Sequence, residues 1–67
     1  MTAFDFMQHM GENERFYIFV EKQDVTGDQA VTLHDVKVGY EERKQVLDAL
    51  EKELICFDAV RSVLYCD

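Results

Sequence analysis

The fold is decided by one stretch of sequence, Arg15-Phe16-Tyr17-Ile18-Phe19-Val20-Glu21-Lys22. Its five central residues are aromatic or β-branched, and such side chains favour an extended chain because they pack well on a pleated surface. Both alternating sets of side chains in this run are apolar, which is typical of a strand covered on both faces. We therefore predict a strand over Arg15–Lys22 whose two faces both need a neighbour.

The segment that follows predicts a hairpin. Asp24–Asp28 has the composition of a turn, in which Gly27 can adopt a positive φ without steric cost. Ala30–Val38 is then the return strand. Its apolar alternation slips by one residue, and a β-bulge near His34-Asp35 would explain the slip.

Three further elements complete the chain. Thr2–Met10 predicts a short helix that Thr2 caps and Gly11 ends. Glu41–Leu54 has the apolar spacing of an amphipathic helix. Val60–Cys66 reads as a third strand, and the right-handed crossover rule makes it parallel to the strand before the helix.

These elements predict one α+β domain over residues 1–67, in the order α-β-β-α-β, with a three-stranded sheet packed on one long helix. That helix can meet only one face of the first strand, so an apolar face remains to be covered. The cover is the N-terminal segment, a second copy of the chain or a foreign partner, and the sequence leaves these three open. The N-terminal Phe4, Phe6, Met7 and Met10, with Tyr65 from the last strand, are further apolar residues for such a contact.

Composition narrows the classes of partner. The chain has 14 acidic and 7 basic residues and a formal net charge of −7. Nucleic acid and anionic membranes require a positive surface, so neither is expected as a direct partner, whereas a basic protein surface is. The first residues contain Asp5 and no basic run, which is unlike a signal peptide, and no apolar run could span a membrane. We expect a cytoplasmic protein.

No pattern indicates catalysis, a cofactor or a metal. His9, His34, Cys56 and Cys66 have the right types for a metal site, but they are not spaced as compact ligand pairs. The two cysteines fall too far apart along the predicted elements to form a disulfide, so we expect reduced thiols. The chain is therefore predicted to be a binding protein and not an enzyme.

The predicted partner-binding residues are Glu21, Asp24 and Asp28 near the hairpin tip and Tyr17 and Phe19 in the first strand. Acidic residues steer the encounter with a basic surface, and aromatic residues slow release. Mimicry of a DNA phosphate ladder is a narrower hypothesis, and the scattered acidic residues favour it less than general protein binding.

The small size, the acidity, the hairpin Arg15–Val38, the helix Glu41–Leu54 and the strand Val60–Cys66 together resemble small phage-encoded host-takeover proteins. That class includes inhibitors of bacterial RNA polymerase, phage antitoxins and anti-CRISPR proteins. The resemblance implies an inhibitor that sits on a basic, nucleic-acid-handling host protein in the bacterial cytosol. Two alternatives stay open, a homodimeric regulatory module and a small thiol-dependent enzyme or redox protein that uses Cys56 or Cys66.

Overall fold

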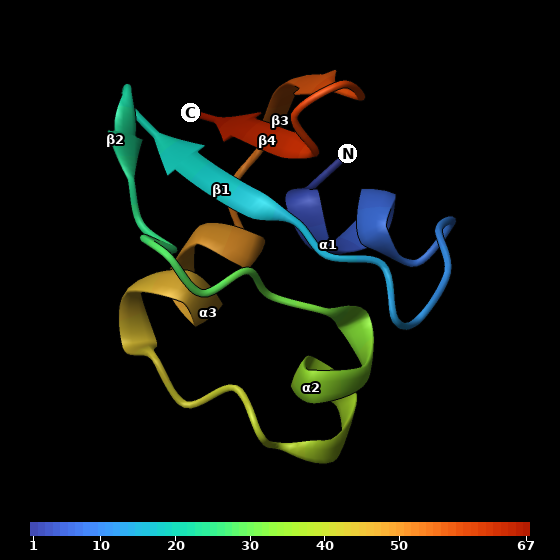
Figure 1. Ribbon diagram of the computed structural model, residues 1–67. Helices are drawn as coiled ribbons and strands as arrows, with labels where there is room; N and C mark the ends of the chain where they lie inside the picture. Colours follow the sequence, from blue (N-terminus) through green and yellow to red (C-terminus); the bar gives the residue numbers. More distant parts are fainter.

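A computed structural model of the chain describes residues 1–67 and has one mixed sheet with the strand order β2-β1-β4-β3 (Figure 1). The elements along the chain are α1 (Ala3–Met7), β1 (Tyr17–Val20), β2 (Gln23–Asp24), α2 (Leu33–Val38), α3 (Lys44–Leu50), β3 (Leu54–Asp58) and β4 (Val63–Cys66). The predicted α+β class is confirmed, although the sheet has four strands instead of three.

The centre of the sheet is the parallel pair β1 and β4. In this pair Ile18 lies beside Leu64 and Val20 beside Cys66. β2 and β3 pair antiparallel with β1 and β4 respectively and form the two edges. The last strand is therefore parallel to β1, not to the predicted strand Ala30–Val38.

The predicted return strand Ala30–Val38 is wrong, because most of it is the helix α2. Thr32 caps this helix by accepting a hydrogen bond from the Asp35 N–H at 3.0 Å, and Gly39 ends it with a φ of 83°. Only Val31 pairs with β1, through a single bridge to Phe16. The slip in alternation reflects the spacing of helical residues and not a β-bulge.

The predicted helix Glu41–Leu54 is too long at both ends. The helix α3 covers only Lys44–Leu50, and Leu54 already belongs to β3. β3 and β4 form a hairpin whose loop holds Val60 at 96% exposure, so the predicted strand Val60–Cys66 begins three residues too early. None of the three helices is both long enough and apolar enough to cross a bilayer.

The N-terminal helix is shorter than predicted but is capped as expected. Thr2 and Asp5 form a reciprocal capping box, in which each side chain accepts a hydrogen bond from the other residue's backbone N–H at 3.1 Å. The helix ends at Met7 with Gln8 as its C-cap and does not continue to Gly11. Thr2 also bridges to Glu53, which ties α1 to the start of β3.

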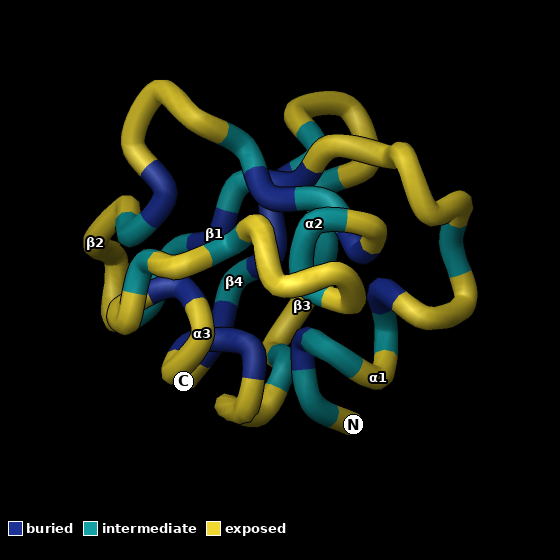
Figure 2. Tube along the Cα trace, turned by 90° about the horizontal axis from the view of Figure 1, so that it is seen from below, coloured by how far each residue is buried: buried dark blue, intermediate teal, exposed yellow.

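All three helices pack on one face of the sheet and form a single core (Figure 1). The ring of Phe57 in β3 contacts Phe6 of the N-terminal segment and Phe16 before β1, with centroids 4.9 and 5.9 Å apart. The buried core consists of Ala3, Met7, Phe16, Ile18, Val31, Leu33, Val46, Ala49, Leu50, Leu64 and Cys66. Figure 2 shows these buried positions where the helices meet the central strands, with exposed positions in β2 and the loops.

Leu64 supports this core from the central strand and is fully buried. We expect Leu64→Ala to reduce the free energy of unfolding by about 2 to 5 kcal/mol, because it removes apolar contacts and leaves a cavity. A domain below about 70 residues has a stability of only a few kcal/mol, so much of the variant should be unfolded. Urea unfolding followed by circular dichroism measures the loss. Val60→Ala is the exposed control, and equal midpoints for the two variants would contradict this assignment of the core.

Candidate functional site

The face of the sheet opposite the helices carries apolar side chains from the two central strands. The register of β1 and β4 places Tyr17 beside Val63 and Phe19 beside Tyr65. Because successive residues of a strand project to opposite faces, these four side chains lie on the face away from Ile18. We call this set, Tyr17, Phe19, Val63 and Tyr65, the aromatic face.

The aromatic face lies outside the main cluster of buried core residues. None of its four residues belongs to that cluster, although Val63 is buried, with 6% of its surface exposed. Phe19 and Tyr65 instead contact each other, with ring centroids 5.5 Å apart and ring planes at 51°. Both rings and that of Tyr17 are partly exposed. The predicted second apolar face is present, and the N-terminal segment does not cover it because α1 lies on the other side of the sheet.

The edge strand β3 extends this face. Cys56 pairs with Tyr65 and Asp58 pairs with Val63, so both side chains belong to the same side of the sheet. Cys56 is exposed. Asp58 accepts a hydrogen bond from the Val60 N–H at 3.0 Å, so its carboxylate shapes the β3–β4 loop. The aromatic face is therefore bordered by one thiol and one carboxylate along β3.

The structure brings three of the five predicted site residues together and separates two. Tyr17 and Phe19 lie on the aromatic face, and Glu21 follows β1 in the turn at its end. Asp24 is in β2, where its carboxylate bonds within its own loop, and Asp28 lines a cleft beside that loop. The hairpin tip is therefore the turn before Gln23 and not Asp24–Asp28.

Asp24 organises the loop that follows it. One oxygen, Oδ1, accepts hydrogen bonds from the Thr26 N–H at 2.9 Å, the Thr26 hydroxyl at 2.8 Å and the Gly27 N–H at 3.0 Å. Burial raises the pKa of Asp24, but these hydrogen bonds outweigh it and hold that pKa below its usual value. The Thr26 hydroxyl oxygen in turn accepts from the buried Ile18 N–H at 3.2 Å. Asp24 thus supports β1 from inside the molecule.

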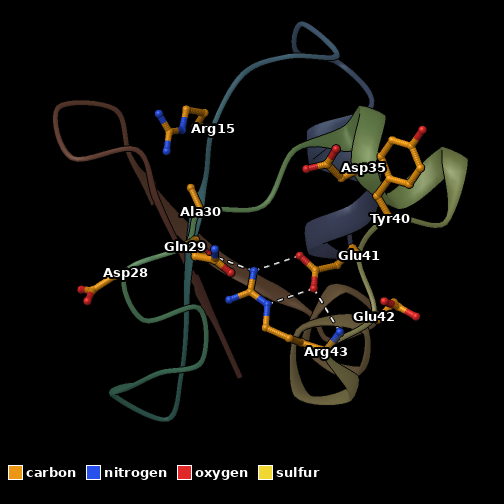
Figure 3. Close-up of a pocket in the computed structure, with 9 residues that line it drawn as sticks. All are labelled: Arg15, Asp28, Gln29, Ala30, Asp35, Tyr40, Glu41, Glu42 and Arg43. Atoms are coloured by element: carbon orange, nitrogen blue, oxygen red, sulfur yellow. Dashed lines mark hydrogen bonds and ion pairs between the residues drawn. The ribbon is translucent and has the colours of Figure 1, made fainter.

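A second polar network fixes the same loop to the segment before α3 (Figure 3). Arg43 donates from Nη1 to the Thr26 carbonyl at 2.7 Å and from Nη2 to the Gln29 carbonyl at 2.9 Å. It also forms a two-point ion pair with Glu41 through Nε and Nη2, both at 2.9 Å. The Glu41 side chain is 7% exposed, and its hydrogen bonds from Arg43 lower its pKa despite that burial.

The cleft around this network has a volume of about 520 Å³ and a polar lining. Its carboxylates include Asp28, Asp35 and Glu42, and Figure 3 shows Asp28 on the same side as Arg15, with Asp35 and Glu42 on the other side. The lining contains no histidine and no cysteine. The cleft therefore has no thiol–imidazole pair.

The thiols and histidines do not assemble into a reactive site. Cys56 projects from the side of the aromatic face, whereas Cys66 is buried in the core on the opposite side. Burial raises the pKa of the Cys66 thiol, which makes the reactive thiolate scarce at neutral pH. No group of three histidine, cysteine or acidic side chains lies where it could hold a metal ion.

A smaller apolar groove lies between the helices, on the side away from the sheet. Its volume is about 430 Å³, and Phe4, Val36, Leu47 and Leu50 supply its apolar lining. Glu51 is the one charged residue in that lining. Leu47 is 36% exposed, so this groove provides a second apolar surface with which the aromatic face can be compared.

We expect Arg43→Met to reduce the free energy of unfolding by about 2 to 4 kcal/mol, because it leaves the nearly buried Glu41 carboxylate without its partner. Lys44→Met is the neighbouring control. The Lys44 ammonium stands 3.9 Å from Asp48 in an exposed ion pair, so its loss should change stability by less than about 0.5 kcal/mol. Urea midpoints of the two variants measure the difference, and similar midpoints would show that the Arg43 network carries no stability.

The same carboxylates predict acid sensitivity. Asp24 and Glu41 have pKa values below those of unfolded chains, so unfolding takes up protons as the pH falls. Their contribution to stability is complete above about pH 4 to 5 and is lost as the pH falls through their folded pKa values. We expect the urea midpoint to drop between about pH 5 and pH 2, and to drop less in Glu41→Gln. A midpoint independent of pH in this range would contradict the pKa directions.

No protein-family model, curated protein or solved structure matches this chain. No residue role can therefore be transferred from a relative. Of the three surfaces described above, the aromatic face contains two of the five predicted partner contacts, Tyr17 and Phe19, and the polar cleft contains one, Asp28.

Proposed function

We propose that this chain is a non-enzymatic binding protein that docks its aromatic face on a cationic surface of another protein. The observation that carries the proposal is that Tyr17, Phe19 and Tyr65 share one sheet face, are partly exposed and lie outside the main core cluster. Tyrosine and phenylalanine are enriched in the centres of protein interfaces, where they supply large contact area with few rotatable bonds. Burial of these rings by a partner would hold the complex together.

Charge selects the kind of partner. A chain with a net charge of −7 attracts a cationic surface and repels a second copy of itself. Long-range attraction of this sort raises the association rate and falls with added salt. The charge therefore favours a basic foreign protein over a homodimer through the same face.

The proposed biological role is inhibition of a basic, nucleic-acid-handling host protein in the bacterial cytosol. Proteins of that kind display cationic surfaces because they bind the phosphate backbone. An acidic domain seated on such a surface would block access for the nucleic acid without any chemistry of its own. A reducing cytosol is also the compartment in which Cys56 and Cys66 would remain free thiols.

The test compares three immobilised proteins with one bacterial lysate at low and moderate salt. The first is the wild-type chain, the second is Phe19→Ser on the aromatic face, and the third is Leu47→Ser in the helical groove. We expect the wild type and Leu47→Ser to retain the same basic protein, and Phe19→Ser to lose at least about tenfold in affinity for it once it is purified. Circular dichroism must first show that each variant is folded.

Two results would overturn the proposal. One is that every protein retained by the wild type is also retained by Phe19→Ser, and the other is that only Leu47→Ser loses retention. Light scattering on the free wild type separates the homodimer alternative. A stable dimer at micromolar concentration that Phe19→Ser converts to monomer would assign the aromatic face to self-association instead.

A further inference from the structure

The turn between β1 and β2 has positive φ angles at two residues that are not glycine. Val20 pairs with Gln23, so the loop consists of Glu21 and Lys22 alone. Their φ angles are 50° and 69°. A two-residue hairpin loop with two positive φ angles is a type I′ turn, for which Asn-Gly is the preferred sequence. Residues with side chains such as these adopt this conformation only at an energetic cost.

Elsewhere Gly27, Gly39 and Ser62 adopt a positive φ, and the Ser62 hydroxyl donates a hydrogen bond to the Arg15 carbonyl. Gly27 has a φ of 60° and Gly39 a φ of 83°. The Glu21 and Lys22 side chains gain nothing visible in exchange, since both residues are exposed and neither forms any of the chain's four ion pairs. Local strain without an internal benefit is characteristic of positions retained for function.

The turn lies next to the aromatic face. The Glu21 N–H donates to the Cys66 carbonyl at 3.4 Å, which places the turn beside the end of β4. The Phe19–Tyr65 ring pair is close to this point, since Phe19 lies two residues before Glu21 in β1 and Tyr65 lies one residue before Cys66 in β4. Figure 1 shows the turn at the tip where β1 passes into β2, close to the end of β4. A partner seated on the rings would reach both charged side chains.

We propose that Glu21 and Lys22 are the specificity contacts of the aromatic face, so this inference rests on the proposed function. Glu21 accepts a Lys or Arg of the cationic partner. Lys22 requires a facing carboxylate and repels a surface that lacks one, which would distinguish the true partner from other basic proteins. The partner's surface is therefore cationic with an acidic residue beside the point that Glu21 contacts.

The decisive variant is Glu21→Asn with Lys22→Gly, which installs the preferred turn sequence and removes both charges. We expect its thermal midpoint to rise by about 4 to 8 °C through relief of strain. The binding partner for this test is the purified protein that the wild type retains and Phe19→Ser does not. The dissociation constant of the turn variant for this partner should rise by about two- to fivefold, as expected for loss of exposed charge contacts. Binding to poly-L-lysine should be unchanged, because the variant removes one acid and one base and leaves the net charge at −7.

The control is Lys44→Gln with Asp48→Asn on α3, which also removes one base and one acid and leaves the net charge unchanged. It should bind the purified protein as the wild type does. The inference is wrong if the turn variant binds that protein with unchanged affinity, if the control weakens equally, or if the thermal midpoint does not rise. If no protein depends on Phe19 for retention, the proposed function fails first and this inference fails with it.

Discussion

The parallel pairing of β1 with β4 is the constraint on which the rest of the molecule depends. It aligns Ile18 with Leu64 on one face of the sheet and Phe19 with Tyr65 on the other. Three short helices of five to seven residues then pack on the first face. Helices of this length are marginal alone, so each exists because of its contact with the sheet.

Two polar networks make that arrangement possible in a small domain. Asp24 and Arg43 both bind the loop that carries Thr26, one through its hydroxyl and the other through its carbonyl. The Thr26 hydroxyl oxygen also accepts a hydrogen bond from the Ile18 N–H, which links the loop to β1. Buried polar groups are therefore satisfied where the loop crosses the core, and no buried side-chain nitrogen or oxygen lacks a partner. Some acidic residues, such as Asp24 and Glu41, therefore stabilise the fold through hydrogen bonds, and the others contribute charge at the surface.

The central strand and the apolar second face could be predicted from the sequence because they follow from strong β-propensity and from alternation in one short run. The α2 region was interpreted as a bulged strand, although Leu33 and Val36 are three residues apart and so share a face of a helix and not of a strand. Local signals for the helix were present. Thr32 stands three residues before Asp35, and Gly39 follows the last helical residue, a pattern typical of helix ends. Pairing that depends on distant residues, such as β1 with β4, leaves no such local mark.

In the candidate site, too, some positions could be predicted from neighbouring residues and others could not. Tyr17 and Phe19 are identifiable from sequence because alternation alone puts them on one face. Asp24 looked equally accessible, but the pattern Asp24-Val25-Thr26-Gly27 also suits a side chain that caps its own turn, and the structure uses it in that way.

The position of the Glu21–Lys22 turn could not be predicted from the sequence. Neither residue is a usual choice for positive φ, so no propensity rule would put the hairpin there. The pairing of Val20 in β1 with Gln23 in β2 leaves only Glu21 and Lys22 to form the turn. The position of the turn therefore depends on strand register and not on the preferences of these two residues. The same register holds these charges next to Phe19 and Tyr65. A sheet face with an apolar centre and charged residues at its end therefore follows from one strand and its two pairings.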